Sequence, residues 1–392
     1  MPIGEANDVT LRFLAESTYG TVPAGSKFKD LRITGESLGA DTTVENSNEL
    51  NSRRNIRDVY RANVGASGDI NFELTYGTFD DLFAYMLMVS AWTTGAALVT
   101  ATTISFAAPD GNGDQVITDS GSGFGSLVAP GWVWVSGAGN TENNGVFKMS
   151  SSNAGAMAIH NPGGVSEPGG ATVKIKEGDT IVNGKSLTSV SIEREHTDIA
   201  NTFAILNGMV PGTMNMDVNE KNIVTGRFGF QGKNEAPATA TSGDGSPTAA
   251  PTNRAYNAVD NVTSILEGGA ETDITRLALS VNNGLRPRGK VGELGPFSMG
   301  KSRINVNGSF TRYFDTNALA IKAANFTETS VALIMNRDSK VYVVEVPSAR
   351  ITNLRRVGGN VDQDVLYEVS FQGHENSTEL ITIRMARFDN PF

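Results

Sequence analysis

Apolar and polar residues alternate along most of this chain, with the period of two that is typical of half-buried β-strands. The alternation is clear in Val9–Leu14, Ile70–Leu74, Leu187–Glu193 and Ile304–Tyr313. Sustained helical spacing is scarce, whereas frequent Val and Thr and 43 glycines indicate strands joined by many turns. The pattern predicts a mainly β protein built from antiparallel sheets.

One segment, Thr78–Met88, has helical spacing instead. Thr78 is a candidate cap, and Asp80 and Asp81 fall in the first turn, where the helix dipole favours negative charge. An apolar stripe would pack this helix against a sheet, and it consists of Phe79, Leu82, Phe83, Met86 and Leu87. A second, short helix is predicted near Thr316–Ala324.

The chain carries a faint internal repeat. Arg227–Gly232 (RFGFQG) resembles Val369–Gly373 (VSFQG), and Gly68–Phe72 resembles the segment that begins Gly308-Ser-Phe310. In both copies a Tyr, an Asp and a Leu follow the second block: Tyr76, Asp80 and Leu82, then Tyr313, Asp315 and Leu319. The spacing of the blocks agrees once about 85 residues are removed from the first copy, which implies one fold used twice.

The removable segment, residues 93–177, is rich in glycine and has about half the charge density of the rest. Its short, evenly spaced strands predict a small β-sandwich or barrel inserted after the helix. Residues 236–255 have the composition of a linker. The predicted division is a first domain of 1–92 with 178–235, an inserted domain of 93–177, a linker of 236–255 and a second domain of 256–392. In the second domain, Lys340–Val346 and Ala349–Leu354 are predicted as separate strands.

The charge and cysteine content exclude several classes of function. The net charge is −10 and no run of Lys and Arg could follow a phosphate backbone, so tight nucleic-acid binding is not expected. The chain has no cysteine, which excludes disulfides, thiolate nucleophiles and cysteine zinc sites. Met1–Glu5 does not open a signal peptide, and the longest apolar run, Leu82–Trp92, is too short to span a bilayer. We expect a soluble protein made in a reducing cytoplasm.

Two motifs resemble ligand sites. Gly295–Ser302 fits the spacing G-x-x-x-x-G-K-S of a phosphate-binding loop, but the alternating residues after it predict a strand where that loop needs a helix. Asp110–Asp114 begins like a calcium loop, yet Gln115 and Gly121 stand at the positions that require Gly and Glu. The three histidines lie far apart, at positions 160, 196 and 374. We therefore predict no catalytic residue, no metal site and no cofactor.

A long polar segment, residues 36–67, separates two predicted strands and carries both signs of charge. Loops of this length in a compact domain usually have a function. The segment is predicted to be a projecting loop or an overlong hairpin. It is either a contact surface or a solvated loop whose charges contribute little. Its candidate contact residues are Glu45, Glu49, Arg53, Arg54, Arg57, Asp58 and Arg61.

Several blocks of the chain closely resemble the tail tube proteins of long, non-contractile-tailed bacteriophages. In the first half they are Ala15–Ala24, Leu31–Leu38, Ser47–Leu50 and Tyr76–Leu82, together with Arg54 and Gly68. In the second half they are Ile304–Phe314 with Asp315 and Leu319, Val341–Pro347 and Gly358–Val365. The resemblance covers most of 1–92 and 178–392 and leaves out 93–177, which suits an added decoration domain.

The resemblance implies a fold of two packed antiparallel sheets with a flanking helix, here in two tandem copies with a small all-β insert. It also implies that a long loop, here residues 36–67, contacts the adjacent ring or subunit. Six such folds would surround a channel for the genome, in stacked rings of three subunits if the fold is duplicated, or alternatively of six. The implied partners are copies of this chain, the tape measure protein and DNA transiently in the lumen, and tail terminator and tail tip proteins at the ends. The implied location is the virion tail, after assembly in the host bacterial cytoplasm.

We expect a lumen lined mainly by Asp, Glu, Ser, Thr, Asn and Gln, because a wall that binds phosphate would hold DNA back. Two alternatives remain open on the sequence. One is a tube protein of a phage-related secretion system. The other is a cell-surface glycan-binding β protein, with Trp132 and Trp134 of the insert as candidate sugar platforms.

Overall fold

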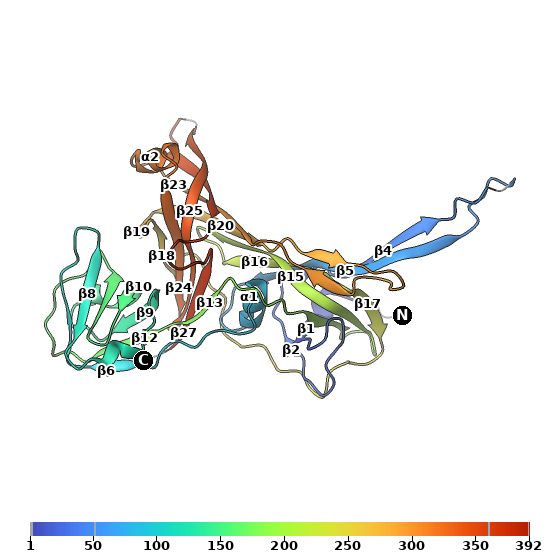
Figure 1. Ribbon diagram of the computed structural model, residues 1–392, viewed down its shortest axis with the longest axis horizontal. Helices are drawn as coiled ribbons and strands as arrows, with labels where there is room; N and C mark the ends of the chain where they lie inside the picture. Colours follow the sequence, from blue (N-terminus) through green and yellow to red (C-terminus); the bar gives the residue numbers. More distant parts are fainter. Residues whose placement is uncertain (1–2, 51, 360, 391) are drawn as a thin grey trace.

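A computed structural model describes residues 3–50, 52–359, 361–390 and 392 of the chain. The molecule is elongated and mainly β (Figure 1), as the alternating pattern predicts. A long hairpin arm projects at one end, and the inserted segment forms a separate lobe at the other. Between them lie two β modules whose sheets are joined through paired strands.

The first half of the chain provides most of the module beside the arm. Its helix is α1 (Asp80–Met86). Its strands are β1 (Val9–Ala15), β2 (Lys29–Asp30), β3 (Gly35–Glu36), β4 (Gly39–Asn46), β5 (Val59–Glu73), β14 (Val190–His196), β15 (Phe203–Asn219), β16 (Thr225–Gly232) and β17 (Asn234–Ala238). Strand β13 (Asp179–Val182) comes from the same half of the chain but pairs with Arg384–Asp389 of the second module.

The second half provides the module beside the insert. Its helix is α2 (Ala318–Ala324). Its strands are β18 (Val262–Glu267), β19 (Ala270–Glu271), β20 (Ile274–Asn282), β21 (Arg286–Arg288), β22 (Ser298–Gly300), β23 (Asn305–Tyr313), β24 (Glu328–Arg337), β25 (Lys340–Gly358), β26 (Val365–Gly373) and β27 (Arg384–Asp389).

The two modules pair their strands in the same order. In the first, the ladder runs β1–β14–β15–β16–β5–β4, with β17 also paired to β15. In the second, it runs β18–β24–β25–β26–β23–β20, with β27 also paired to β25. The irregularities match as well, because β15 and β25 each have a register shift against the next strand, between Pro211 and Thr213 and between Ile351 and Asn353.

The sequence blocks that suggested the repeat occupy equivalent positions in these ladders. Phe230 of β16 lies opposite Gly68 of β5, and Phe371 of β26 lies opposite Gly308 of β23. A Cβ on Gly308 would lie 2.2 Å from the Phe371 ring, so the ring needs a glycine across the ladder. A Cβ on Gly68 would instead meet the backbone of Ser37 and Leu38. The recurring Gly and Phe therefore share a ladder position in the two modules, although the glycine makes room for different neighbours.

Helix α1 packs over the first module with its apolar stripe buried, as predicted. Phe79 lies 4.3 Å, centroid to centroid, from Phe72 of β5, which stacks at 5.0 Å on Phe228 of β16. The prediction that Thr78 caps the helix was wrong. The N-cap residue is Phe79, and the Thr78 hydroxyl instead accepts a 2.7 Å hydrogen bond from Thr75.

Residues 93–177 form a seven-stranded sheet of their own. Its core is separate from that of the modules and includes Ile117, Phe124, Val133 and Ile175. The strands are β6 (Val99–Ala101), β7 (Ile104–Phe106), β8 (Asp114–Asp119), β9 (Gly131–Ser136), β10 (Gly145–Ser152), β11 (Ala156–His160) and β12 (Val173–Glu177).

The segment after β17, for which the sequence predicts a linker, lies against the first module. The backbone N–H of Thr248 donates to the carbonyl of Phe28, and Asp30 donates back to Thr248. Thr241 donates a 2.9 Å hydrogen bond to the buried carboxylate of Glu193. These bonds hold the segment against β14 and against the residues around β2.

The phosphate-loop motif at 295–302 is followed by a strand and not by a helix, as the sequence predicts. Its residues include the edge strand β22, and the next element is strand β23. No helix N-terminus follows the glycines, so the backbone amides do not converge as a phosphate site requires.

Candidate assembly surfaces

The arm is a hairpin of β4 and β5 that extends well beyond the body (Figure 1). All seven predicted contact residues lie on it and are exposed: Glu45, Glu49, Arg53, Arg54, Arg57, Asp58 and Arg61. Arg57 pairs with Glu49 near the tip, with both side chains more than half exposed. An ion pair this exposed contributes little to folding, so these charges remain available to direct an interaction.

The arm also exposes large apolar side chains, which the sequence analysis did not single out. Leu50 is fully exposed, and Ile56, Tyr60, Val44 and Val59 are each more than half exposed. Apolar residues gathered on a projecting hairpin indicate a surface that another molecule covers. Their presence among the charged residues of 36–67 is the sequence feature that could have indicated an apolar contact surface.

The two modules are joined edge to edge by β15 and β20. Thr213–Asn219 pairs antiparallel with Arg276–Asn282 without a register shift. On the side of the sheet away from the helices, Arg276 donates a 2.7 Å hydrogen bond to Asp217 across this junction. A strand of the first module thus completes the sheet of the second.

The joined sheet has a concave groove of about 990 Å³ on that side. Its polar lining is mostly amide and hydroxyl, including Asn71, Asn215, Ser280, Asn307, Ser309 and Ser370. Two charged residues of the described chain, Asp217 and Arg227, line the groove, and both are paired: Asp217 with Arg276, and Arg227 with Asp69 at 3.1 Å. Such a wall offers a polyanion few free cations.

Helix α1 lies between the modules and is sealed by the second. Tyr342 of β25 donates to Asp80, and its ring lies 6.1 Å from that of Phe83. Arg387 of β27 forms an ion pair with Asp80. Burial raises the pKa of Asp80, an effect that Arg387 and Tyr342 oppose. A buried carboxylate with these two partners holds the modules in one relative position.

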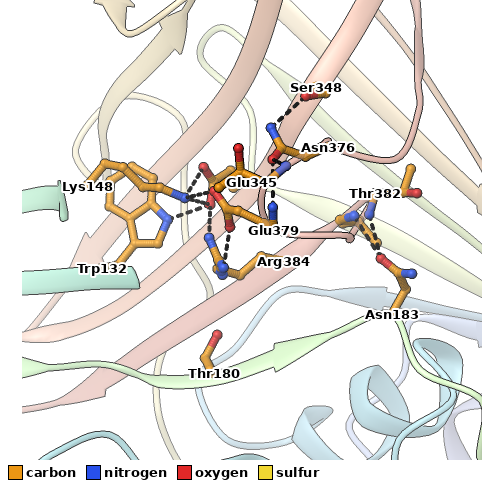
Figure 2. A network of polar contacts seen from close by, with 12 residues as sticks. Trp132, Lys148, Thr180, Asn183, Glu345, Ser348, Asn376, Glu379, Thr382 and Arg384 are labelled. Carbon is orange, nitrogen blue, oxygen red and sulfur yellow. Dashed lines mark hydrogen bonds and ion pairs between the residues drawn. The ribbon is translucent and has the colours of Figure 1, made fainter. Parts of the chain in front are cut away.

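The insert is fixed to the second module by a buried polar cluster (Figure 2). Glu345 of β25 accepts hydrogen bonds from Trp132 at 2.8 Å and from Lys148 at 2.7 Å, both in the insert. Arg384 of β27 pairs with Glu345 at 3.1 Å and with Glu379. Burial would raise the pKa of Glu345, but Lys148 and Arg384 outweigh it and hold the pKa below its usual value.

An apolar contact surrounds this cluster. Trp132 packs with Ile334, Val341 and Val343 of the second module, and Trp134 lies edge-on to Phe388 at 5.9 Å. The insert therefore sits on the module formed by the other half of the chain. Trp132 is only 3% exposed, so its face is not open to a sugar ring.

Within the described residues, no group of three or more His, Asp or Glu side chains could hold a metal ion. The helices described, likewise, include none that is long and apolar enough to cross a membrane.

Two modules joined through strand edges, an inserted lobe and a projecting arm define a mainly β protein. The model of the phage tail tube protein family matches residues 6–373. The chain belongs to this family and is a structural component of the virion tail that assembles into a tube. None of the curated proteins matches it.

Proposed function

We propose that this chain forms stacked rings around the channel through which a phage genome leaves the virion. Each ring would contain three copies, and each copy would contribute two tube folds, from 1–92 with 178–235 and from 256–392. The insert, residues 93–177, would decorate the outside, and assembly would take place in the host cytoplasm. The tape measure protein and DNA would occupy the lumen in turn, with terminator and tip proteins at the ends.

The observation that carries this proposal is the strand junction inside the chain. Pairing of β15 with β20 shows how one module extends the sheet of the next. Exposed strand edges are a liability in a monomer, but a closed ring of modules leaves none unpaired. Two modules with the same pairing order supply two of the six positions that such a ring needs.

The concave groove is then the channel wall. Its amide and hydroxyl lining and its internally paired charges suit a surface along which DNA must slide. The net charge of −10 acts in the same direction, since it weakens any binding of phosphate.

The arm is the proposed contact between rings. Its mixed charges would set register and partner choice, and its exposed apolar residues would supply burial on docking. We expect Arg53→Glu with Arg54→Glu to give a folded subunit that polymerises poorly, as measured by tube length in electron micrographs. Lys174→Glu with Lys185→Glu reverses two cations away from the arm and should leave polymerisation intact. Tubes of normal length from the arm variant would reject this role.

A secretion-system tube remains the second candidate, because the same wall could pass a protein. The two functions differ in what passes through the tube. Tubes that are isolated together with other phage tail proteins would support a conduit for DNA. A glycan-binding role has less support, since Trp132 is buried against the second module.

A further inference from the structure

We propose that residues 353–358 of β25 pair with residues 36–41 of a second copy, in the register that β15 and β20 use inside the chain. This inference rests on the proposed ring and names the residues that close it. Among the residues that the structure describes, no strand pairs with the outer edge of β25 beyond residue 352 or with the outer edge of β4.

The free edge of β25 corresponds to the paired edge of β15. Thr213 lies opposite Gly229 directly after the register shift of β15, and Asn353 lies opposite Ser370 directly after the register shift of β25. Residues 213–218 therefore occupy the positions that 353–358 occupy in the second module. The first set pairs with β20, whereas the second set has an open side.

The free edge of the first module corresponds to β20. Asn282 lies opposite Asn305, three residues before Gly308, and Asp41 lies opposite Gly65, three residues before Gly68. Because Gly308 and Gly68 are equivalent, residues 35–41 occupy the positions of residues 276–282. The same strand position is paired with a strand in one module and has no strand partner in the other. There, the Leu38 N–H donates to Glu36 and the Leu38 carbonyl accepts from Arg194, and a neighbouring strand would replace these two side-chain bonds.

The register of β15 with β20 can therefore be applied to β25 and residues 36–41 of a second copy. Thr213 faces Asn282 in the internal junction, so Asn353 should face Asp41 of the next copy. The following pairs are Leu354 with Ala40, Arg355 with Gly39, Arg356 with Leu38, and Val357 with Ser37.

The chemistry of the two edges fits this register. Leu354 packs against the core of its own module, and Leu38 is 6% exposed in the core of the other, so apolar side chains would meet on the helix side. On the concave side, exposed Arg355 would stand diagonally across from exposed Asp41, within reach of a long side chain. Opposite charges at this spacing favour the register, as Arg276 and Asp217 do inside the chain.

Helix α2 adds a second, independent observation. Only Leu319 is buried in α2, while Ile321 is 58% exposed and the nearby Phe326 is 53% exposed. The corresponding helix α1 is covered by β25 and β27 of the adjacent module. By equivalence, β15 and β17 of the next copy would cover Ile321 and Phe326. A second copy is the occupant that continues the interface already present.

The chain has no cysteine, so paired cysteines test the register cleanly. We would introduce Asn353→Cys with Asp41→Cys, assemble tubes, oxidise them and separate the products without reductant. Paired positions across a ladder have the Cα spacing that a disulfide needs. The expected result is a ladder of covalent dimers and trimers that ends at three copies.

Two matched variants complete the experiment. Thr213→Cys with Asn282→Cys marks the same pair in the internal junction and should give a bridge within one chain, with no increase in mass. Asn353→Cys with Gly39→Cys is displaced by two residues and should cross-link at least tenfold less. Tubes that form but cross-link equally in both registers, or in neither, would overturn the register and leave the proposed function standing. If the unmodified chain forms neither rings nor tubes, both proposals fail.

Discussion

The two helices of this protein occupy equivalent places in equivalent modules, yet their surroundings differ. In α1, six of the seven residues are buried, including Asp80 with its partners Tyr342 and Arg387. In α2, only Leu319 is buried, and α2 lies at an extremity of the molecule (Figure 1). The first helix is sealed by the neighbouring module of its own chain, and the second faces outward.

In the proposed ring, the junction that covers α1 inside the chain would be repeated between chains at α2. The internal version can use buried charges such as Asp80 with Arg387, because both partners fold together and are never separated in solution. The free version must remain soluble before assembly, so its helix carries isolated apolar residues and no unpaired buried charge. Covering those residues would then add stability only in the ring.

Removing Arg387 should have the largest effect on the isolated subunit. Arg387→Ala leaves Asp80 buried without its cation, and breaking such a pair costs about 3 kcal/mol. We expect a lower denaturant midpoint for the unassembled protein. Arg276→Ala removes a pair whose arginine is 55% exposed and should cost less than about 1 kcal/mol. Equal losses from the two variants would contradict the distinction between sealed and exposed contacts.

A charge introduced on α2 should have little effect on the stability of the subunit and a large effect on assembly. Ile321 is exposed in the subunit, so Ile321→Asp should change the free energy of unfolding by no more than about 0.5 kcal/mol. Assembly should fail, because the aspartate would be buried against the next copy. Light scattering during assembly measures this directly.

The matched control for that variant lies on the insert. Val116→Asp changes an exposed apolar residue on β8 of the insert, away from the proposed junction between copies, and should assemble normally. If Ile321→Asp polymerises as well as Val116→Asp does, α2 does not face a neighbouring copy.

Much of the fold could be predicted from local patterns. The alternating segments, the helix at 80–86 and the recurring Gly and Phe all act through near neighbours or through one ladder. Strand β15 was missed even though Met214, Met216 and Val218 alternate with polar residues. Its middle part, residues 208–212, has no alternation, because these five residues in succession are all buried.

Strand β25 was predicted incorrectly for a different reason. The prediction of two strands, Lys340–Val346 and Ala349–Leu354, was wrong because the structure has one strand from Lys340 to Gly358. Pro347 lies within the register shift, between the residues that pair with Thr329 and Val331, where the ladder does not require its missing N–H. A proline is compatible with a long strand at such a bulge.

The candidate contact surface was predicted in part. The charged residues of the arm could be located from composition, and the structure places them on one hairpin. The attachment of the insert could not, because Lys148, Glu345 and Arg384 lie far apart in sequence and meet only in the folded chain. No local pattern distinguishes such buried charges from exposed ones.

The central claim is that three copies, each with two modules, close one ring. The most direct test is the rotational symmetry of a single ring, imaged end-on by electron microscopy of assembled tubes. The account predicts a wall of six modules with three insert lobes on its outside, and hence threefold symmetry. A ring with six copies and six insert lobes would contradict it.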